Sequence, residues 1–305
     1  MEADFILDEL EITATPFALC ELNGACDLGL GQVPTATLHF VLAGSGEVTL
    51  PDQPAIPVTR GDLILVPALN RHVLRSFGEP GPETPDCQAD KLGLAHFIHQ
   101  SDEGATGKLI ALCATFTLTL RRMRNLVDLI RAPIIERHAE MTMLGLPMEQ
   151  MLREVSRPGP GSRAMINALL LQCMIQLLRA RLQAGDPALG WMDGLRDARL
   201  WPVIRNMLDH PGHSHSVESL AAQAGMSRSG FAQRFQDAYG RGPMEMLREI
   251  RMRHAAQLLA ESDLPVKRIS EMSGFRSRSA FSRTFEALLG KPPKLFRSES
   301  RIPPG

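Results

Sequence analysis

Apolar positions along the chain follow two different periods. In residues 1 to 80, apolar and β-branched runs such as TLHFVLAG, GEVTL and GDLILVPA alternate with clusters of Gly, Pro and Asp. Short runs separated by turn residues predict β-strands at near-regular spacing, as in a β-barrel or jelly roll. From about Asn125 onward, apolar residues recur at intervals of three and four, which is the spacing of one helical face. The pattern therefore predicts a β-rich domain followed by helices.

A surface loop is expected at residues 78–91, because GEPGPETPDCQADK is rich in Pro, Gly and acidic residues. The runs LAHFIH and KLIALCATFTLTL follow this loop and predict the last strands of the β-rich domain. These elements place a β-barrel in residues 1–120.

The longest helix is predicted over residues 162–184, with Ser162 as its N-terminal cap and Gly185-Asp186-Pro187 at its end. Its apolar surface is wider than one stripe, so it is expected to bury against more than its own barrel. A well-packed core helix would also explain this surface, but a dimer interface shared with a helix near 142–155 is favoured. Residues 121–190 are therefore expected to form a helical dimerisation segment.

One pattern is written twice in the last third of the chain. The first copy reads VESLAAQAGMSRSGFAQRFQDAYGRGP from Val217, and the second reads VKRISEMSGFRSRSAFSRTFEALLGKPP from Val266. Each copy has a short apolar helical face, a glycine suited to end that helix, a serine that can cap the next helix, and two phenylalanines one turn apart. Two helix-turn-helix units are predicted, near 217–238 and 266–288, in a domain spanning 195–300.

The second helix of each unit carries many hydrogen-bond donors at positions that do not hold the fold. Such side chains can bind base edges and phosphates when the helix lies in a major groove. A single arginine-rich helix would more simply be a solvated surface, but two in register favour DNA recognition. If the apolar helix between the units holds them about 34 Å apart, both can enter successive major grooves. The expected DNA-binding residues are Arg228, Ser229, Gln233, Arg234, Gln236, Arg276, Ser277, Arg278, Ser279, Ser282, Arg283 and Thr284.

Residues 197–298 resemble the DNA-binding domain of AraC/XylS-type transcriptional regulators. The stretch Ser216–Gly225, the Gly242-Pro243 step and the run Gly290-Lys291-Pro292-Pro293 carry the resemblance, together with the phenylalanines between them. Met246 stands where the family usually has a tyrosine, and either side chain can fill a core gap. The resemblance implies a regulator whose N-terminal domain binds an effector and does no chemistry.

The β-rich region resembles a cupin domain. GDLILVPALNRH, which ends in His72, matches the second cupin motif, whereas in the first motif His39 is present and Val41 replaces the usual second histidine. A complete site of three histidines and a carboxylate is therefore not expected. His39, His72 and His96 are expected to contact a small-molecule effector or to be hydrogen-bonded within the barrel. A divalent metal at His39 and His72 is the less favoured interpretation.

Charge is distributed unevenly along the chain. Residues 198–305 hold 17 Lys and Arg against 10 Asp and Glu, and residues 1–197 hold 16 against 24. The basic part coincides with the repeat, as expected for a part that binds duplex DNA and releases counterions from its phosphates. The acidic part is better suited to sensing or assembly.

Five cysteines lie in the acidic part, and no signal-peptide pattern or long apolar run is seen in the sequence. We therefore expect a cytoplasmic protein with reduced thiols and no membrane partner. Cys113 and Cys173 lie in apolar runs and are expected in the core. Cys20, Cys26 and Cys87 lie near turn-like segments, which leaves a thiol-based redox-sensing regulator open as an alternative.

No acid-base pair, nucleophile elbow or phosphate-binding glycine loop is visible in the sequence, so no enzyme activity is expected. The expected fold is α+β and multidomain: an N-terminal cupin-like β-barrel with a helical dimerisation segment, and a C-terminal all-α domain with two helix-turn-helix units. The expected function is a homodimeric, sequence-specific transcriptional regulator that binds double-stranded DNA under control of an effector. RNA polymerase is a further partner if the protein is an activator. A metal-dependent cupin enzyme fused to a DNA-binding module is the remaining alternative.

Overall fold

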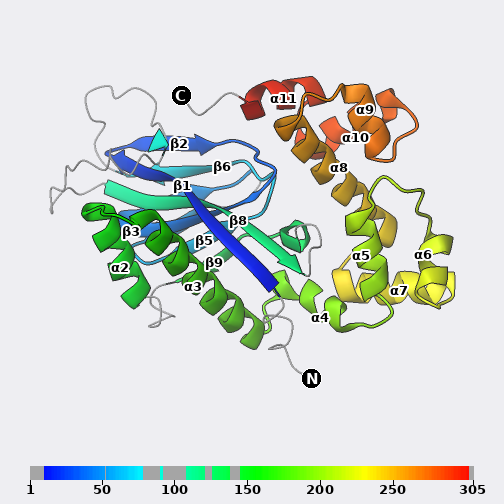
Figure 1. Cartoon of the computed structure of the whole chain (residues 1–305), viewed down its shortest axis with the longest axis horizontal. Helices are drawn as coiled ribbons and strands as arrows, with labels where there is room; N and C mark the ends of the chain where they lie inside the picture. Colours follow the sequence, from blue (N-terminus) through cyan, green and yellow to red (C-terminus); the bar gives the residue numbers. More distant parts are fainter. Residues whose placement is uncertain are drawn as a thin grey trace. The chain divides into compact units, whose positions relative to one another are not determined.

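The structure is a computed structural model of the chain. Its described residues fall in six segments, 10–51, 53–77, 90–91, 108–120, 126–137 and 145–301. The chain forms two compact units, which we name the sheet unit and the helical unit (Figure 1). The sheet unit consists mainly of Glu11–Leu118 and Ala132–Ala184, and the helical unit mainly of Thr119–Arg131 and Gly185–Pro303.

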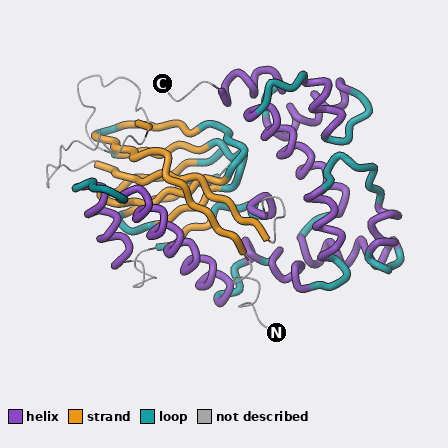
Figure 2. The backbone as a smooth tube through the Cα atoms, in the orientation of Figure 1, coloured by secondary structure: helices purple, strands orange, loops and turns teal. Residues whose placement is uncertain are grey.

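The sheet unit is built from antiparallel strands (Figure 2). The strands are β1 (Leu10–Asn23), β2 (Cys26–Leu30), β3 (Ala36–Thr49), β4 (Ile56–Thr59), β5 (Leu63–Val66), β6 (His72–Ser76), β7 (Asp90–Lys91), β8 (Lys108–Leu120) and β9 (Ile134–Glu136). Their order is β2-β6-β3-β8-β1-β7, with β4 and β5 also paired to β3, and β9 paired to β5. The described order ends at β2 and β7, so closure into the expected barrel stays a prediction.

Strand β3 connects the sheet because it pairs with four other strands. Its first half pairs with β5 and β8, and its second half pairs with β4 and β6. The ladder with β8 shifts register between Val41 and Ala43. Gly44 follows with a φ of +78°, and a Cβ there would lie 1.6 Å from the carbonyl oxygen of Lys108 on β8. The sequence pattern predicts two short strands here, whereas the glycines let one long strand bend and let β8 approach.

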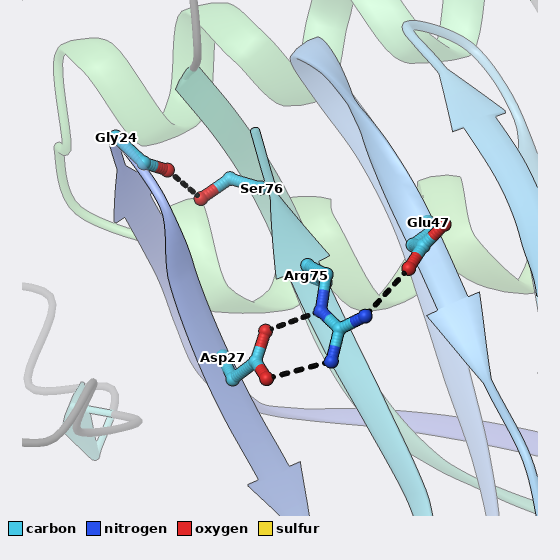
Figure 3. A network of polar contacts seen from close by, with 5 residues as sticks. All are labelled: Gly24, Asp27, Glu47, Arg75 and Ser76. Carbon is cyan, nitrogen blue, oxygen red and sulfur yellow. Dashed lines mark hydrogen bonds and ion pairs between the residues drawn. The ribbon is translucent and has the colours of Figure 1, made fainter. Parts of the chain in front are cut away.

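Arg75 on β6 joins three neighbouring strands (Figure 3). In the two ladders it lies directly opposite Asp27 on β2 and Glu47 on β3. Its Nε and Nη2 donate to both carboxylate oxygens of Asp27 at 2.6 and 2.8 Å, and its Nη1 donates to Glu47 at 3.0 Å. The hydrogen bond from Arg75 lowers the pKa of Asp27. Beside it, the Ser76 hydroxyl donates to the Gly24 carbonyl at 2.7 Å, so the edge at β2 is tied down by polar contacts.

Two helices, α2 (Gly145–Ser156) and α3 (Ser162–Gln183), pack together in the sheet unit. Near the end of α3, Arg181 Nε donates to Glu136 Oε2 on β9 at 2.8 Å. Both helices belong to the same compact unit as the sheet, and the dimerisation role expected for residues 121–190 stays a prediction.

The apolar residues of α3 form one buried stripe. Its buried apolar residues are Ile166, Leu169, Leu170, Cys173, Met174, Leu177 and Leu178. Outside the stripe, Met165 is 49% exposed. By length and composition α3 could also span a membrane, but the core helix of a soluble protein passes the same test. The burial of the stripe within the sheet unit accounts for its hydrophobicity.

The start of α3 differs from the expected cap. Gly161, with a φ of +86°, is the residue before the helix, and no side chain caps it. The Ser162 hydroxyl instead accepts a hydrogen bond from the Gly159 amide at 2.8 Å. Ser162 therefore fixes the preceding turn rather than the helix end.

The helical unit contains eight described α-helices, and α8 separates two helix-turn-helix units. They are α4 (Trp191–Arg196), α5 (Trp201–Asp209), α6 (Val217–Gln223), α7 (Arg228–Tyr239), α8 (Pro243–Glu261), α9 (Val266–Met272), α10 (Arg278–Leu289) and α11 (Pro293–Arg301). Two 3-10 turns, η2 (Leu126–Leu129) and η5 (Pro187–Leu189), belong to the same unit. The predicted repeat is confirmed as α6–α7 and α9–α10.

Local chemistry explains the turns of both units. Ser227 and Ser277 cap the second helices by accepting from the amides three residues later, at 3.2 and 3.4 Å. Gly225 and Gly274 follow the first helices with φ values of +62° and +77°, in the left-handed region that favours glycine. Met272 follows Val266 and Ile269 at helical spacing, which predicts that it lies on the inner face of α9, but it is 36% exposed.

The spacer helix α8 is anchored to the rest of the unit. Arg251 donates from Nε to the Pro211 carbonyl and from Nη2 to the His213 carbonyl, both at 2.7 Å. Met246 is 3% exposed, in agreement with its expected role as a core residue.

The sequence after Arg297, which ends in RIPPG, predicts a disordered tail, whereas helix α11 extends into it. Helix α11 runs to Arg301 because it has its own apolar anchor. Phe296 is 1% exposed and meets the Phe285 ring edge to face, at a centroid distance of 5.4 Å.

Candidate nucleic-acid interface

Helix α7 has one face in the core and one in solvent. Phe231, Phe235 and Tyr239 are buried and form a column of ring contacts, with centroid distances of 5.5 and 4.7 Å. Because these residues repeat every four positions, Ser229 and Gln233 lie on other faces, and both are exposed. The exposed face therefore offers a hydroxyl and an amide to a ligand.

Helix α10 repeats this arrangement with more positive charge. Phe281, Phe285 and Leu289 are buried. Arg276, Arg278, Ser279 and Arg283 are exposed, whereas Ser282 and Thr284 are partly buried at the edge of the inner face. Ser277 is occupied as the helix cap and also lies 2.8 Å from the Ser279 hydroxyl.

The arginines of α7 are paired with acidic groups of their own unit. Arg228 Nη2 lies 2.7 Å from Glu218 Oε1, and Arg234 Nε lies 2.5 Å from Asp197 Oδ2. Gln233 likewise donates to Asp237 at 2.8 Å. DNA contacts by these side chains would have to replace existing partners.

The guanidinium groups of Arg276, Arg278 and Arg283 differ in this respect. Within the described part of the chain, none of them makes an ion pair or a hydrogen bond. An unpaired guanidinium on an exposed helix face can bind a phosphate or a guanine edge without first losing a partner. The second unit is therefore the better prepared of the two for an anionic ligand.

The expected effector and metal residues lie in the sheet unit. His39 and His72 come together, with 2.7 Å between their Nε2 atoms. His39 uses its other nitrogen, Nδ1, toward Cys113 at 3.2 Å. Because His72 and Cys113 contact opposite nitrogens of the His39 ring, His39 cannot bind one metal ion together with both of them. Accordingly, no group of three or more metal-ligating side chains is found among the described residues. His96 lies outside the described residues.

The cysteines expected near turns have different surroundings. Cys20 lies within β1 and is 1% exposed, with its Sγ 2.9 Å from that of Cys113. Cys113 and Cys173 are each 0% exposed, so their expected burial is confirmed. Cys87 and the side chain of Cys26 lie outside the described residues.

Two contacts were not predicted from the sequence, that of Asp197 with Arg234 and that of Cys113 with His39. Asp197 precedes α5 and accepts from the Arg199 and Leu200 amides, at 3.0 and 3.3 Å. Aspartate before a helix is a recognisable local signal, but its pairing with Arg234 is not local. Cys113 lies directly opposite His39 in the β3–β8 ladder, a pairing that the sequence does not reveal.

Comparison with known families matches both units. The family described as "Helix-turn-helix domain" matches residues 220–299, and the family described as "Cupin" matches residues 4–183. The second match covers the whole described sheet and both of its helices, in agreement with their grouping in one unit.

Curated relatives match over most of their length. The HTH-type transcriptional regulator AlkR of Acinetobacter baylyi is 25% identical, with 97% of this chain and 98% of that protein covered. The RCS-specific HTH-type transcriptional activator RclR of Escherichia coli is 26% identical, over 90% of this chain and 88% of that protein. A putative AraC-like transcription regulator of Streptomyces antibioticus is 32% identical, over 57% of each chain.

Among solved structures, the DNA-binding domain of AdpA in complex with a target DNA is 36% identical, with 34% of this chain and 96% of that chain covered and a TM-score of 0.33.

Proposed function

Because the chain belongs to the AraC family of helix-turn-helix transcriptional regulators and carries an N-terminal cupin domain, we propose that its α10 arginines are the principal DNA contacts. The protein is a DNA-binding transcriptional regulator with an effector-binding domain, and not an enzyme. We propose in addition that its two helix-turn-helix units contribute unequally to DNA binding.

The observation that carries this proposal is the difference in pairing between α7 and α10. Arg228 and Arg234 are held by Glu218 and Asp197, whereas no partner of Arg278 is found among the described residues. Exchanging an ion pair for a DNA contact gains less than forming a contact from a free, hydrated arginine. In this proposal α10 supplies most of the affinity, while Ser229 and Gln233 of α7 add base contacts.

Effector control is proposed to act through the helical unit's residues Thr119–Arg131. This segment begins with the last two residues of β8 and precedes β9, yet it groups with the helical unit. Arg131 and Arg241 both donate to the carboxylate of Glu249 on α8. A shift of β8 on effector binding would therefore pull on the spacer between the two DNA-binding units. Coupling of about 1 to 3 kcal/mol would be enough for regulation.

We further propose a cytoplasmic homodimer, with RNA polymerase as partner if the protein activates transcription. Exposed apolar side chains on α2 and α3 support a self-association surface, since Leu146 is 73% and Met165 is 49% exposed. The effector is expected to bind in the sheet unit, where His39 and His72 lie.

The proposal is tested in two steps with the full-length protein. Fragments bound from random or genomic DNA are first selected and sequenced, with and without candidate effectors, to define the operator. Fluorescence anisotropy titrations then compare the wild type with Arg283→Ala and with Arg163→Ala, which removes an exposed positive charge from α3. Arg283→Ala is expected to weaken operator binding at least tenfold, or about 1.4 kcal/mol. Equal effects of both substitutions would reject the assignment.

A further inference from the structure

Four buried side chains form a continuous chain of contacts inside the sheet unit. Cys20 and Cys113 lie on β1 and β8, which are neighbours in the sheet, and His39 and His72 lie on β3 and β6. Their exposures are 1%, 0%, 0% and 1%, so water does not reach them. The DNA-binding function makes no use of these groups.

Each contact in this chain is within hydrogen-bonding distance. Cys20 Sγ lies 2.9 Å from Cys113 Sγ, and Cys113 Sγ lies 3.2 Å from His39 Nδ1. His39 Nε2 lies 2.7 Å from His72 Nε2, and His72 Nδ1 lies 3.0 Å from the Asn70 carbonyl oxygen.

The last contact determines the direction of all the others. Burial lowers the pKa of His39, with the neighbouring His72 as a second cause, and burial likewise lowers the pKa of His72, so both rings are neutral at pH 7. A neutral imidazole carries one N–H, and the Asn70 carbonyl can only accept. His72 Nδ1 must therefore be the donor to Asn70, which leaves His72 Nε2 as an acceptor.

The tautomer of His72 in turn determines that of His39. His39 donates from Nε2 to His72, so His39 Nδ1 has no hydrogen and accepts from the Cys113 thiol. Cys113 Sγ is also 3.8 Å from the Ala111 carbonyl, but the shorter contact is the one to the imidazole. The Cys20 thiol in turn can donate to Cys113 Sγ. An unprotonated imidazole nitrogen thus lies against one thiol of a pair of adjacent thiols.

We propose that Cys20 and Cys113 are a modification site: a buried dithiol that hydrogen peroxide converts to a disulfide, with His39 as the proton acceptor. A disulfide bond is about 2.0 Å long, so the two sulfur atoms need to approach by only about 1 Å. This proposal concerns the sheet unit alone and does not depend on the proposed DNA contacts.

The reaction balances with hydrogen peroxide as the oxidant. The Cys113 proton passes to His39 Nδ1 while Cys113 Sγ attacks one peroxide oxygen. The O–O bond breaks, and the departing hydroxide takes the proton from His39 and leaves as water, which gives a sulfenic acid at Cys113. Cys20 Sγ then attacks that sulfur, the S–O bond breaks, and the hydroxyl leaves with the Cys20 proton as a second water. Two thiols are oxidised to one disulfide, and one peroxide is reduced to two waters.

Burial determines which oxidants can react. A small uncharged molecule such as hydrogen peroxide can reach the buried thiols when the fold opens locally, whereas a large charged disulfide such as oxidised glutathione would need a much wider opening. Burial also raises the pKa of the Cys113 thiol, with the contact to Cys20 as a further cause, so the thiolate is scarce at neutral pH. Proton acceptance by His39 is therefore the step that allows Cys113 to attack.

Cys173 provides a matched control within the same unit. It is equally buried, and burial raises the pKa of its thiol to about 12. It lies on α3, and among the described residues no second thiol or imidazole contacts it.

The experiment treats the reduced full-length protein with hydrogen peroxide, blocks remaining thiols, and identifies cross-linked peptides by mass spectrometry after non-reducing digestion. A Cys20–Cys113 cross-link is expected in the wild type and in Cys173→Ser, and its formation should be slowed about tenfold or more in His39→Gln. The wild-type result decides the matter even if a core substitution impairs folding.

Three results would overturn the proposal. One is a cross-link that joins Cys20 to Cys26 or Cys87 in place of Cys113. Another is oxidation of Cys113 to the sulfinic acid with no cross-link. The third is one equivalent of transition metal in the purified protein that is lost in both Cys20→Ser and Cys113→Ser, because thiolates bound to a metal would not be a free dithiol.

Discussion

Arg234 on α7 donates from Nε to Asp197 Oδ2 at 2.5 Å. The other carboxylate oxygen of Asp197 accepts from the amides of Arg199 and Leu200, at the start of the path into α5. One carboxylate therefore ties α7 to the segment of the helical unit that leads into α5.

Replacing Asp197 with Asn should weaken the helical unit without changing its DNA preference. The substitution removes charge from an acceptor whose side chain is 14% exposed, and a loss of about 1 kcal/mol in the free energy of unfolding is expected. Denaturant unfolding measures this loss. Asp209→Asn is the control, because among the described residues Asp209 meets only the exposed Arg205 of its own helix, at 3.5 Å. A changed operator preference in Asp197→Asn would show that Arg234 reads DNA.

The same carboxylate should make stability depend on pH. Burial acts to raise the pKa of Asp197, but the hydrogen bonds from Arg234 and the two amides together outweigh it and lower the pKa. A carboxyl whose pKa is lowered by folding stabilises the folded state above its ordinary pKa of 3.8, and this contribution disappears as pH falls through the lowered value. The Asp197→Asn variant should accordingly be less stable than the wild type at neutral pH. Its free energy of unfolding should decrease less than that of the wild type as the pH is lowered.

Arg278→Ala and Arg228→Ala should separate base recognition from phosphate contact. Each is expected to cost about 1 to 3 kcal/mol of binding free energy if the arginine binds a base, with relaxed preference at one operator position. A uniform loss over all sequences, with a salt slope reduced by about 1, would instead identify a phosphate contact. Because Arg228 must first leave Glu218, its substitution should have the smaller effect. Anisotropy titrations at several salt concentrations measure both quantities.

The two turn glycines should tolerate alanine unequally. A Cβ at Gly225 would meet no atom within 4 Å, so Gly225→Ala should cost only the strain of a positive φ, about 1 to 2 kcal/mol. A Cβ at Gly274 would lie 2.8 Å from Arg251 Nη2 and 2.9 Å from the Gly212 carbonyl oxygen. Gly274→Ala should therefore cost a further 1 kcal/mol or so in thermal unfolding. Equal losses would mean that both Arg251 and the Gly212 backbone can move away without cost.

The buried histidines predict a loss of stability in mild acid. Folding lowers the pKa of His39 and His72 below the ordinary value of 6.5, so the unfolded chain binds protons that the folded chain does not. The stability of the sheet unit should therefore fall as pH decreases below about 6.5. Thermal unfolding between pH 5 and 8 would detect this fall. It should be smaller in the double substitution His39→Gln and His72→Gln, and unchanged in His213→Gln, whose side chain is exposed.

Local patterns predicted the helical unit well because its determinants are close together in sequence. The serine caps, the positive-φ glycines and the paired phenylalanines of α7 and α10 each act within a few residues, and all occur as expected. The exception is the C-terminal helix, whose anchor Phe296 packs on a residue of the preceding helix.

The sheet unit was predicted less completely because its determinants are distant in sequence. Gly44 marks a turn in a local interpretation, but the backbone of Lys108 approaches it from β8. His39 and His72 were expected to contact an effector or to be hydrogen-bonded within the barrel, and their Nε2 atoms lie 2.7 Å apart on neighbouring strands. The pairing of Cys20 with Cys113 spans 93 positions and follows only from the strand order.

The placement of Thr119–Arg131 in the helical unit determines which fragments of the protein can fold on their own. The segment has three buried apolar side chains, Leu126, Leu129 and Ile130, which are at most 4% exposed. It therefore contributes to the core of the helical unit. A fragment that starts at Gly185 would lack these three side chains and would expose the apolar surface that they cover. Such a truncated protein should aggregate, and fusing the missing segment to it through a linker should keep it in solution.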